Sequence, residues 1–131
     1  MTIVVAYADT PPGHAALKAA AEEALRRQSP IVVVGAERGH PVSVEQAAQV
    51  LGEQAVSLQA AGLALRVEES ALHDPSDAVI QVAQELDAEL ICVGLRRRSP
   101  VGKLVLGSTA QRILLDATCP VLSVKAESSV A

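Results

Sequence analysis

"TIVVAYADTPPGHAALKAAAEEALRRQSPIVVVGA", Thr2 to Ala36, joins two apolar runs through an alanine-rich segment. The first run is Thr2 to Ala8, the second is Pro30 to Ala36, and both are rich in valine. Continuous apolar runs are typical of strands that are covered on both faces. The segment between them, His14 to Gln28, has the composition of a helix. Strand, helix and strand in this order predict a parallel pair of strands joined by a crossover helix.

The same alternation continues along the rest of the chain. The remaining expected elements are a helix from the Ser43 cap to Gly62, an edge strand at Leu63–Ser70, a helix capped by Asp74 with Pro75 at its first position, a strand at Glu89–Gly94, a helix from Gly107 or Ser108 to about Ala117, and a strand at Pro120–Lys125. This order predicts an α/β fold with an open parallel sheet and helices on both faces. We expect a single domain, residues 1–126, and a short flexible tail, residues 127–131.

The composition excludes several classes of protein. Half of the 131 residues are apolar, Tyr7 is the single aromatic residue, and the net charge is −4. Such a chain has no overall basic field for nucleic acid and lacks the aromatic platforms of single-strand binders. No apolar run reaches the ~20 residues of a membrane span, and Met1 leads into a strand without a signal peptide. We therefore expect a cytoplasmic domain without nucleic-acid or membrane partners, in which Cys92 and Cys119 are buried free thiols.

The order of elements also predicts where a ligand would bind. In open parallel sheets, ligands bind beyond the carboxyl ends of the strands, at the point where the strand order reverses. The loops to consider are therefore those that follow Ala8, Ala36, Ser70 and Val93.

The segment after the last of these, "GLRRRSPVGKLVLGSTAQRIL" (Gly94 to Leu114), combines three arginines with a glycine–serine helix start. Ser108 and Gln111 are three residues apart and fit a capping box. The same helix start would offer backbone N–H groups and the positive end of the helix dipole to a phosphate, and the two interpretations are compatible. The arginines at 96–98 fit either a solvated loop or a set of guanidinium contacts to an anion.

Several established motifs are absent from the chain. A Walker A loop needs glycine at position 97 and Ser or Thr at position 104, where this chain has Arg97 and Leu104. There is no G-x-G-x-x-G after the first strand and no G-x-S-x-G elbow. A response-regulator receiver would need an acidic cluster after the first strand, where Asp9 stands alone. The three histidines are scattered without metal-ligand spacing, so we expect no metal site in the protein alone.

From Thr2 to Lys125 the chain resembles the universal stress protein family. Many members carry the motif G-x2-G-x9-G-[ST], and Gly94, Gly107 and Ser108 match its first glycine, last glycine and hydroxyl residue. Arg97 stands in place of the middle glycine, and the closing "ATCPVLSVK" is similar to the family's last strand. The resemblance implies a five-stranded sheet in the order 3-2-1-4-5, of the adenine-nucleotide α-hydrolase-like type.

The resemblance also implies a nucleotide site. In nucleotide-binding members the motif holds phosphates and ribose, small apolar residues line the adenine, and an aspartate lies beside the nucleotide. Here Ala8 stands at the aspartate position, with Asp9 one place later. The arginine at the glycine position would either fill the nucleotide's space or pair with its phosphates. The implied contacts are Ala6, Ala8, Asp9, Ala36, Val93, Gly94, Arg97, Gly107, Ser108 and Thr109.

The function implied by the resemblance is that of a stress-response homodimer that binds ATP, with Mg²⁺ present only together with the nucleotide. The last strand, Pro120 to Lys125, would join the two copies, because an unpaired sheet edge invites a second chain. The alternative is a nucleotide-free dimeric scaffold of the same family that acts through protein contacts. A nucleotide hydrolase ranks below both because no general base stands out, so ATP hydrolysis would be very slow at most.

Overall fold

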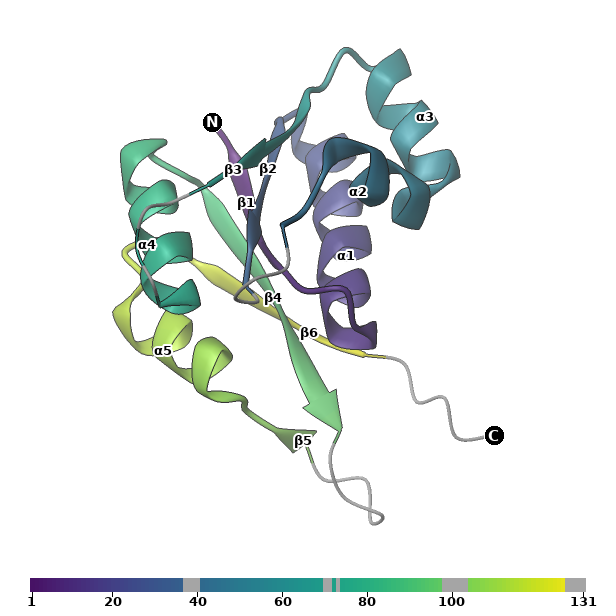
Figure 1. Cartoon of the computed structure of the whole chain (residues 1–131). Coiled ribbons are helices and arrows are strands. Elements are labelled where there is room, and N and C mark those ends of the chain that lie inside the picture. Colours follow the sequence, from purple (N-terminus) through teal and green to yellow (C-terminus); the bar gives the residue numbers. More distant parts are fainter. Residues whose placement is uncertain (37–40, 70–71, 73, 98–103, 127–131) are drawn as a thin grey trace.

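A computed structural model describes residues 1–36, 41–69, 72, 74–97 and 104–126 of the chain. The elements, labelled in Figure 1, are β1 (Ile3–Tyr7), α1 (Pro11–Arg27), β2 (Ile31–Gly35), α2 (Val44–Leu51), α3 (Glu53–Ala60), β3 (Leu65–Glu68), α4 (Pro75–Glu85), β4 (Leu90–Arg97), β5 (Leu104–Val105), α5 (Ser108–Asp116) and β6 (Val121–Lys125). Within these ranges no helix has the length and apolar character needed to cross a membrane. The expected tail, residues 127–131, lies outside the described residues.

Five parallel strands form the sheet in the order β3-β2-β1-β4-β6. Leaving out the short β5, this is the expected order 3-2-1-4-5, and the predicted fold is confirmed. The order reverses between β1 and β4, which creates a crevice at their carboxyl ends. The sequence-based prediction lacks β5, which pairs antiparallel with the end of β4. It also ends β4 at Gly94, whereas the strand continues to Arg97.

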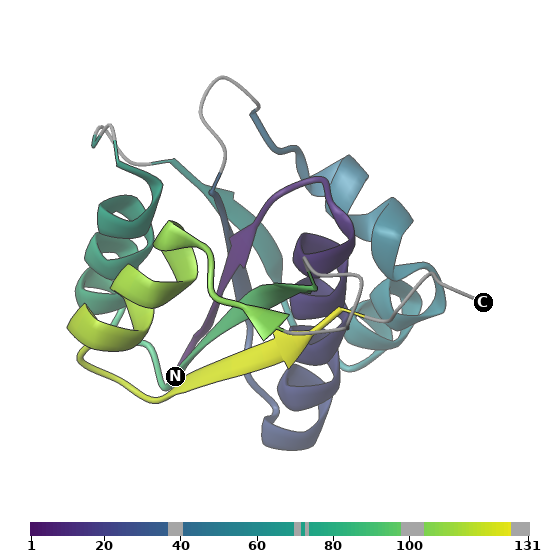
Figure 2. The ribbon, with the colours of Figure 1, turned by 90° about the horizontal axis from the view of Figure 1, so that it is seen from below.

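Different helices cover the two faces of this sheet. Figure 2 shows α4 and α5 on one side and α1, α2 and α3 on the other. Successive residues of β1 point to opposite sides: Ile3, Val5 and Tyr7 pack with α1, whereas Val4 and Ala6 pack with α4. All five are buried. Burial on both faces explains why β1 is a continuous apolar run rather than an alternating one.

The helix starts follow the capping residues of the sequence, with one correction. Ser43 forms a capping box with Gln46, and the Asp74 carboxylate accepts hydrogen bonds from the start of α4, as expected. The predicted start of the first helix at His14 is wrong, because α1 begins at Pro11. Thr10 caps it by accepting a hydrogen bond from the Gly13 N–H at 3.3 Å. Proline is suited to this position because the first turn leaves its N–H groups without helical partners.

The expected single helix between Ser43 and Gly62 is also wrong, because two helices replace it. Gly52 has φ 60° and ψ −118°, a conformation that is open mainly to glycine, and it separates α2 from α3. The bend allows both short helices to bury a leucine against the sheet: Leu51 and Leu58 are 5% and 1% exposed. The apolar spacing in the sequence therefore correctly indicates helical residues that face the core, but these residues belong to two helices.

Candidate functional site

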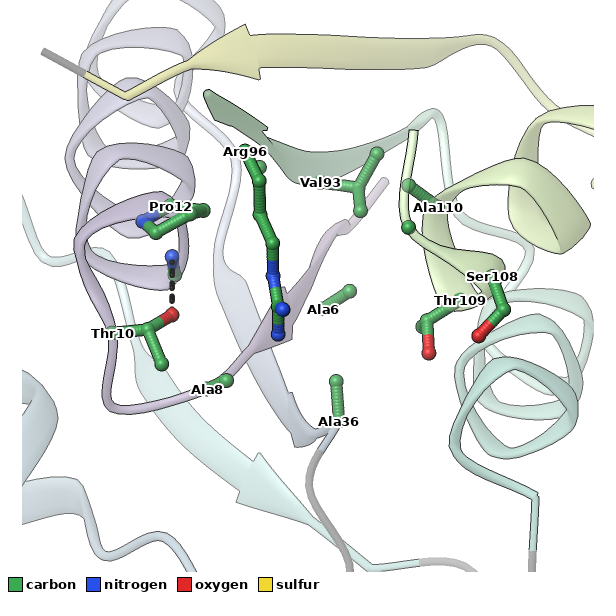
Figure 3. Close-up of a pocket in the computed structure, with 13 residues that line it drawn as sticks. Ala6, Ala8, Thr10, Pro12, Ala36, Val93, Arg96, Ser108, Thr109 and Ala110 are labelled. Carbon is green, nitrogen blue, oxygen red and sulfur yellow. Dashed lines mark hydrogen bonds between the residues drawn. The ribbon is translucent and has the colours of Figure 1, made fainter. Parts of the chain in front are cut away.

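A pocket of about 190 Å³ lies at the carboxyl ends of β1 and β4, where the strand order reverses (Figure 3). It is lined by Ala6, Ala8, Thr10, Pro12, Gly13, Ala36, Val93, Gly94, Arg96, Gly107, Ser108, Thr109 and Ala110. Of the contacts expected from the sequence, this lining contains all but Asp9 and Arg97, and the side chain of Arg97 lies outside the described residues. The residues come from four separate segments, so only the fold assembles them.

One wall of the pocket is made of small apolar side chains. Ala6 of β1 and Val93 of β4 are each 4% exposed, and Ala36 follows the end of β2. All three belong to the cluster that packs the sheet against α4 and α5. Because alanine fills little space, this wall leaves room for a flat apolar group against the strand ends.

The start of α5 forms the side of the pocket across from Arg96 and Thr10 (Figure 3). Gly107 is the N-cap residue, and no side chain caps the helix. The capping box expected between Ser108 and Gln111 is absent, because the Gln111 N–H donates to the Gly107 carbonyl. The first N–H groups of a helix have no partner within the helix and carry the positive end of its dipole. Figure 3 shows the Ser108 and Thr109 hydroxyls on this side of the pocket.

Gly94 allows the start of α1 to pack closely against β4. A Cβ at this position would overlap the backbone carbonyl of Pro12 at the start of α1. A Cβ at Gly13 would likewise overlap the carbonyl of Ala8. These two glycines therefore hold the β1–α1 turn against the end of β4. At Gly107, by contrast, a Cβ would meet nothing within 4 Å, because that residue faces open space.

Arg96 is a pocket residue that the site prediction missed. Its side chain runs from β4 across the pocket toward Ala8, between Thr10 and the hydroxyls of α5 (Figure 3). Within the described part of the chain, no ion pair joins it to an acidic side chain. The alternation of side chains along a strand could have predicted this, since it puts Arg96 on the same face of β4 as Gly94.

Arg97, the arginine that the motif alignment favours, also belongs to β4, where its backbone pairs with Leu104. Its side chain lies outside the described residues. The expectation that Arg97 either fills the pocket or pairs with phosphate therefore stays a prediction. Among the described arginines, Arg96 lines the pocket.

Asp9 lies on the other side of the β1–α1 turn. With Tyr7 it lines a second cavity of about 420 Å³, beside α2, and Ala8 borders both cavities. The Asp9 carboxylate is 2.7 Å from Nε2 of His14, whose ring stacks on Tyr7 at a centroid distance of 6.0 Å. Burial, followed by the charge and hydrogen bond of Asp9, raises the pKa of Tyr7. Asp9 is thus occupied by His14 and Tyr7 and does not join the other expected contacts.

The described lining contains hydroxyls and one guanidinium but no carboxylate, imidazole or thiol. Neither cysteine is activated elsewhere: burial raises the pKa of Cys92 to about 12 and also raises that of Cys119. Both are free thiols as expected, although Cys119 is only half-buried. Among the residues that the structure covers, no group of three or more His, Cys, Asp or Glu side chains could hold a metal. The described lining is therefore suited to an anion with an apolar part and contains no group that could act as a general base.

Comparisons with known proteins show the family of the chain. A model described as the "Universal stress protein family" matches residues 1–125. A universal stress protein of Mycolicibacterium smegmatis is 37% identical over 125 residues, which cover 94% of this chain and 96% of that protein.

Solved structures are similar over the same length. A universal stress protein from Archaeoglobus fulgidus has a TM-score of 0.68 and 31% identity, covering 95% of this chain and 97% of its own. Another structure, of the universal stress protein from Archaeoglobus fulgidus in complex with dAMP, has a TM-score of 0.64 and 27% identity, with 95% and 96% covered.

Proposed function

Because the chain belongs to the universal stress protein family, we propose that it binds an adenine nucleotide in the pocket between β1, β4 and the start of α5. The uncapped α5 start beside an apolar wall is the observation that carries this proposal. A relative of similar fold and 27% identity was solved in complex with dAMP, which supports the choice of ligand.

The base and the phosphate would contact different groups of lining residues. The adenine would lie against Ala6, Ala36 and Val93, where a flat aromatic ring removes apolar surface from water. The phosphate would face the N–H groups and hydroxyls of Ser108 and Thr109, because a helix start favours negative charge. Gly94 would contribute indirectly, by bringing the β1–α1 turn close to β4.

ATP is the nucleotide that the resemblance implies, and we retain it as the proposed physiological ligand. Hydrolysis would be very slow or absent, because the described lining holds no base to activate water. We propose the cytoplasm as the location because Cys92 and Cys119 are unpaired, as is usual for proteins in a reducing compartment.

We also propose that two copies pair through β6. One side of this strand pairs with β4, and no other described strand pairs with its second side. Leu122 in the middle of β6 is 37% exposed, so pairing would cover apolar surface as well as backbone groups. The alternative function, a nucleotide-free dimeric scaffold, is favoured by one observation: Arg96 already occupies part of the pocket.

The test is a thermal-shift titration with AMP, dAMP, ADP and ATP on the wild type and on Ser108→Glu. Ligands that bind only the native state raise the unfolding temperature, and we expect adenine nucleotides to do so for the wild type. In Ser108→Glu a carboxylate would face the phosphate, so the shift should disappear. The free variant should remain folded, because a negative charge at a helix start is stabilising.

Gln111→Glu is the matched control, because it adds the same charge to the first turns of α5 at an exposed residue outside the pocket lining. This variant should keep the thermal shift. If the wild type shows no shift with any adenine nucleotide, the scaffold function replaces the proposed one.

A further inference from the structure

The residues of the pocket do not fit a magnesium ion. Mg²⁺ at a nucleotide is usually held by one or two carboxylates in addition to the phosphates. The described lining has none: Ala8 stands where the family has an aspartate, and Asp9 is turned toward His14 on the other side of the turn. On α4, the carboxylate of Asp77 is 3.2 Å from the guanidinium of Arg112, and neither residue lines the pocket. Outside the described residues, the segment 98–103, "RSPVGK", contains no acidic residue, and the segment 37–40, "ERGH", contains one, Glu37, next to Ala36.

The pocket contains positive groups that could neutralise a phosphate without a metal. The Arg96 guanidinium lies in the pocket, with the uncapped start of α5 across from it (Figure 3). Arg96 has an exposed side chain and, among the described residues, no acidic partner to hold it elsewhere. A guanidinium can donate two parallel hydrogen bonds to one phosphate group, which an ammonium cannot do with the same geometry.

We propose that Arg96 takes the place of the metal, so that this pocket binds its adenine nucleotide without Mg²⁺. The inference rests on the proposed nucleotide binding and specifies how the phosphate charge is neutralised. Arg96 and Mg²⁺ then compete for the same phosphate oxygens. Mg²⁺ should weaken the binding of ATP, which chelates it strongly, and should have little effect on the binding of AMP.

Calorimetric titrations of the full chain with AMP and ATP, each in EDTA and in excess Mg²⁺, test this proposal. For the wild type we expect binding in EDTA, an AMP affinity that changes less than about twofold with Mg²⁺, and weaker ATP binding with Mg²⁺. Arg96→Gln should bind AMP about 10- to 100-fold more weakly, the range of one charged hydrogen-bonded contact. Arg96→Lys should fall between the two, since it keeps the charge but not the paired geometry.

Arg66→Gln is the matched control. Arg66 lies on β3, across β2 and β1 from β4, is exposed and does not line the pocket. This variant loses the same charge and should bind as the wild type does. Thermal unfolding of each free variant checks the fold, which should be intact because both arginines are exposed.

Three results would overturn the inference. Binding of ATP that requires Mg²⁺ in the wild type would show that a metal neutralises the phosphates, while the proposed nucleotide binding would stand. Equal AMP binding by folded Arg96→Gln would show that Arg96 does not contribute to binding, and tighter binding would show that it obstructs the pocket. Absence of binding in every condition would remove the proposed function itself, and this inference with it.

Discussion

Two glycines of the same motif have different physical tasks in this structure. Gly94 is packed so closely on Pro12 that a side chain has no room, whereas Gly107 faces open space with φ −66°, a value that any residue adopts. The first therefore supports the site through the backbone packing of the β1–α1 turn. The second keeps the start of α5 accessible.

This difference predicts opposite stability effects of the same substitution. Gly94→Ala should lower the free energy of unfolding by at least about 2 kcal/mol, because the overlap is with a backbone carbonyl that cannot rotate away. Gly107→Ala should change it by less than about 1 kcal/mol. Urea denaturation measures both values. Equal midpoints for wild type and Gly94→Ala would contradict the close approach described here.

At the arginine and aspartate positions of the site, the sequence pattern does not predict which of two neighbouring residues lines the pocket. The chain has two candidates at each position: Arg96 or Arg97, and Ala8 or Asp9. The motif alignment favours Arg97 and puts Ala8 at the aspartate position. Shifting by one residue at a strand end moves a side chain to the other face of the sheet, so the alignment does not show which neighbour lines the pocket. The structure places Arg96 and Ala8 in the pocket, and Asp9 beside the second cavity.

Among the helices and strands, those with a strong local signal were predictable from the sequence. The valine-rich runs correctly predicted β1 and β2, and the Asp74–Pro75 pair correctly predicted the start of α4. The break at Gly52 was not predictable, because one glycine in a helical pattern costs only about 1 kcal/mol and the apolar spacing continues through it. The two-residue β5 is too short to have a periodicity.

The cap of α4 should contribute to the pH dependence of stability. Hydrogen bonds from Ser76 and from the Asp77 N–H lower the pKa of Asp74 below its usual value of 3.8. Because the folded-state pKa is the lower one, this stabilisation is present above about pH 3.8 and is lost as the pH falls through the folded-state pKa.

Asp74→Asn tests this assignment. Asparagine is also a good helix cap but does not titrate, so the variant should stay folded near neutral pH. Its free energy of unfolding, followed by urea denaturation from pH 6 to pH 2, should fall less steeply below about pH 4 than that of the wild type. An identical slope would show that the cap carboxylate has the same pKa in the folded and unfolded chains.

At the scale of the whole molecule, the sheet has two features on which the proposals depend. The crevice between β1 and β4 provides a pocket, and β6 provides an edge. Both follow from the strand order, which the resemblance implies and the structure confirms. The ligand and the partner do not follow from the strand order, because the same fold can carry different sites.

The proposed dimer predicts a specific sensitivity to charge on β6. Sedimentation equilibrium at micromolar concentration should give twice the 13.5 kDa mass of one chain. Leu122→Lys should yield monomers, because an edge lysine opposes strand pairing. Val56→Lys is the control, since Val56 is 67% exposed on α3 at a distance from β6, and it should remain dimeric. A monomeric wild type would exclude this assembly.

The central claim is that the pocket holds an adenine nucleotide, and titration calorimetry of the wild-type chain with dAMP tests it most directly. We expect saturable binding with one nucleotide per chain, in EDTA, that is lost in Ser108→Glu and kept in Gln111→Glu. Absence of saturable heat with dAMP, or equal binding by Ser108→Glu, would contradict the assignment of this pocket.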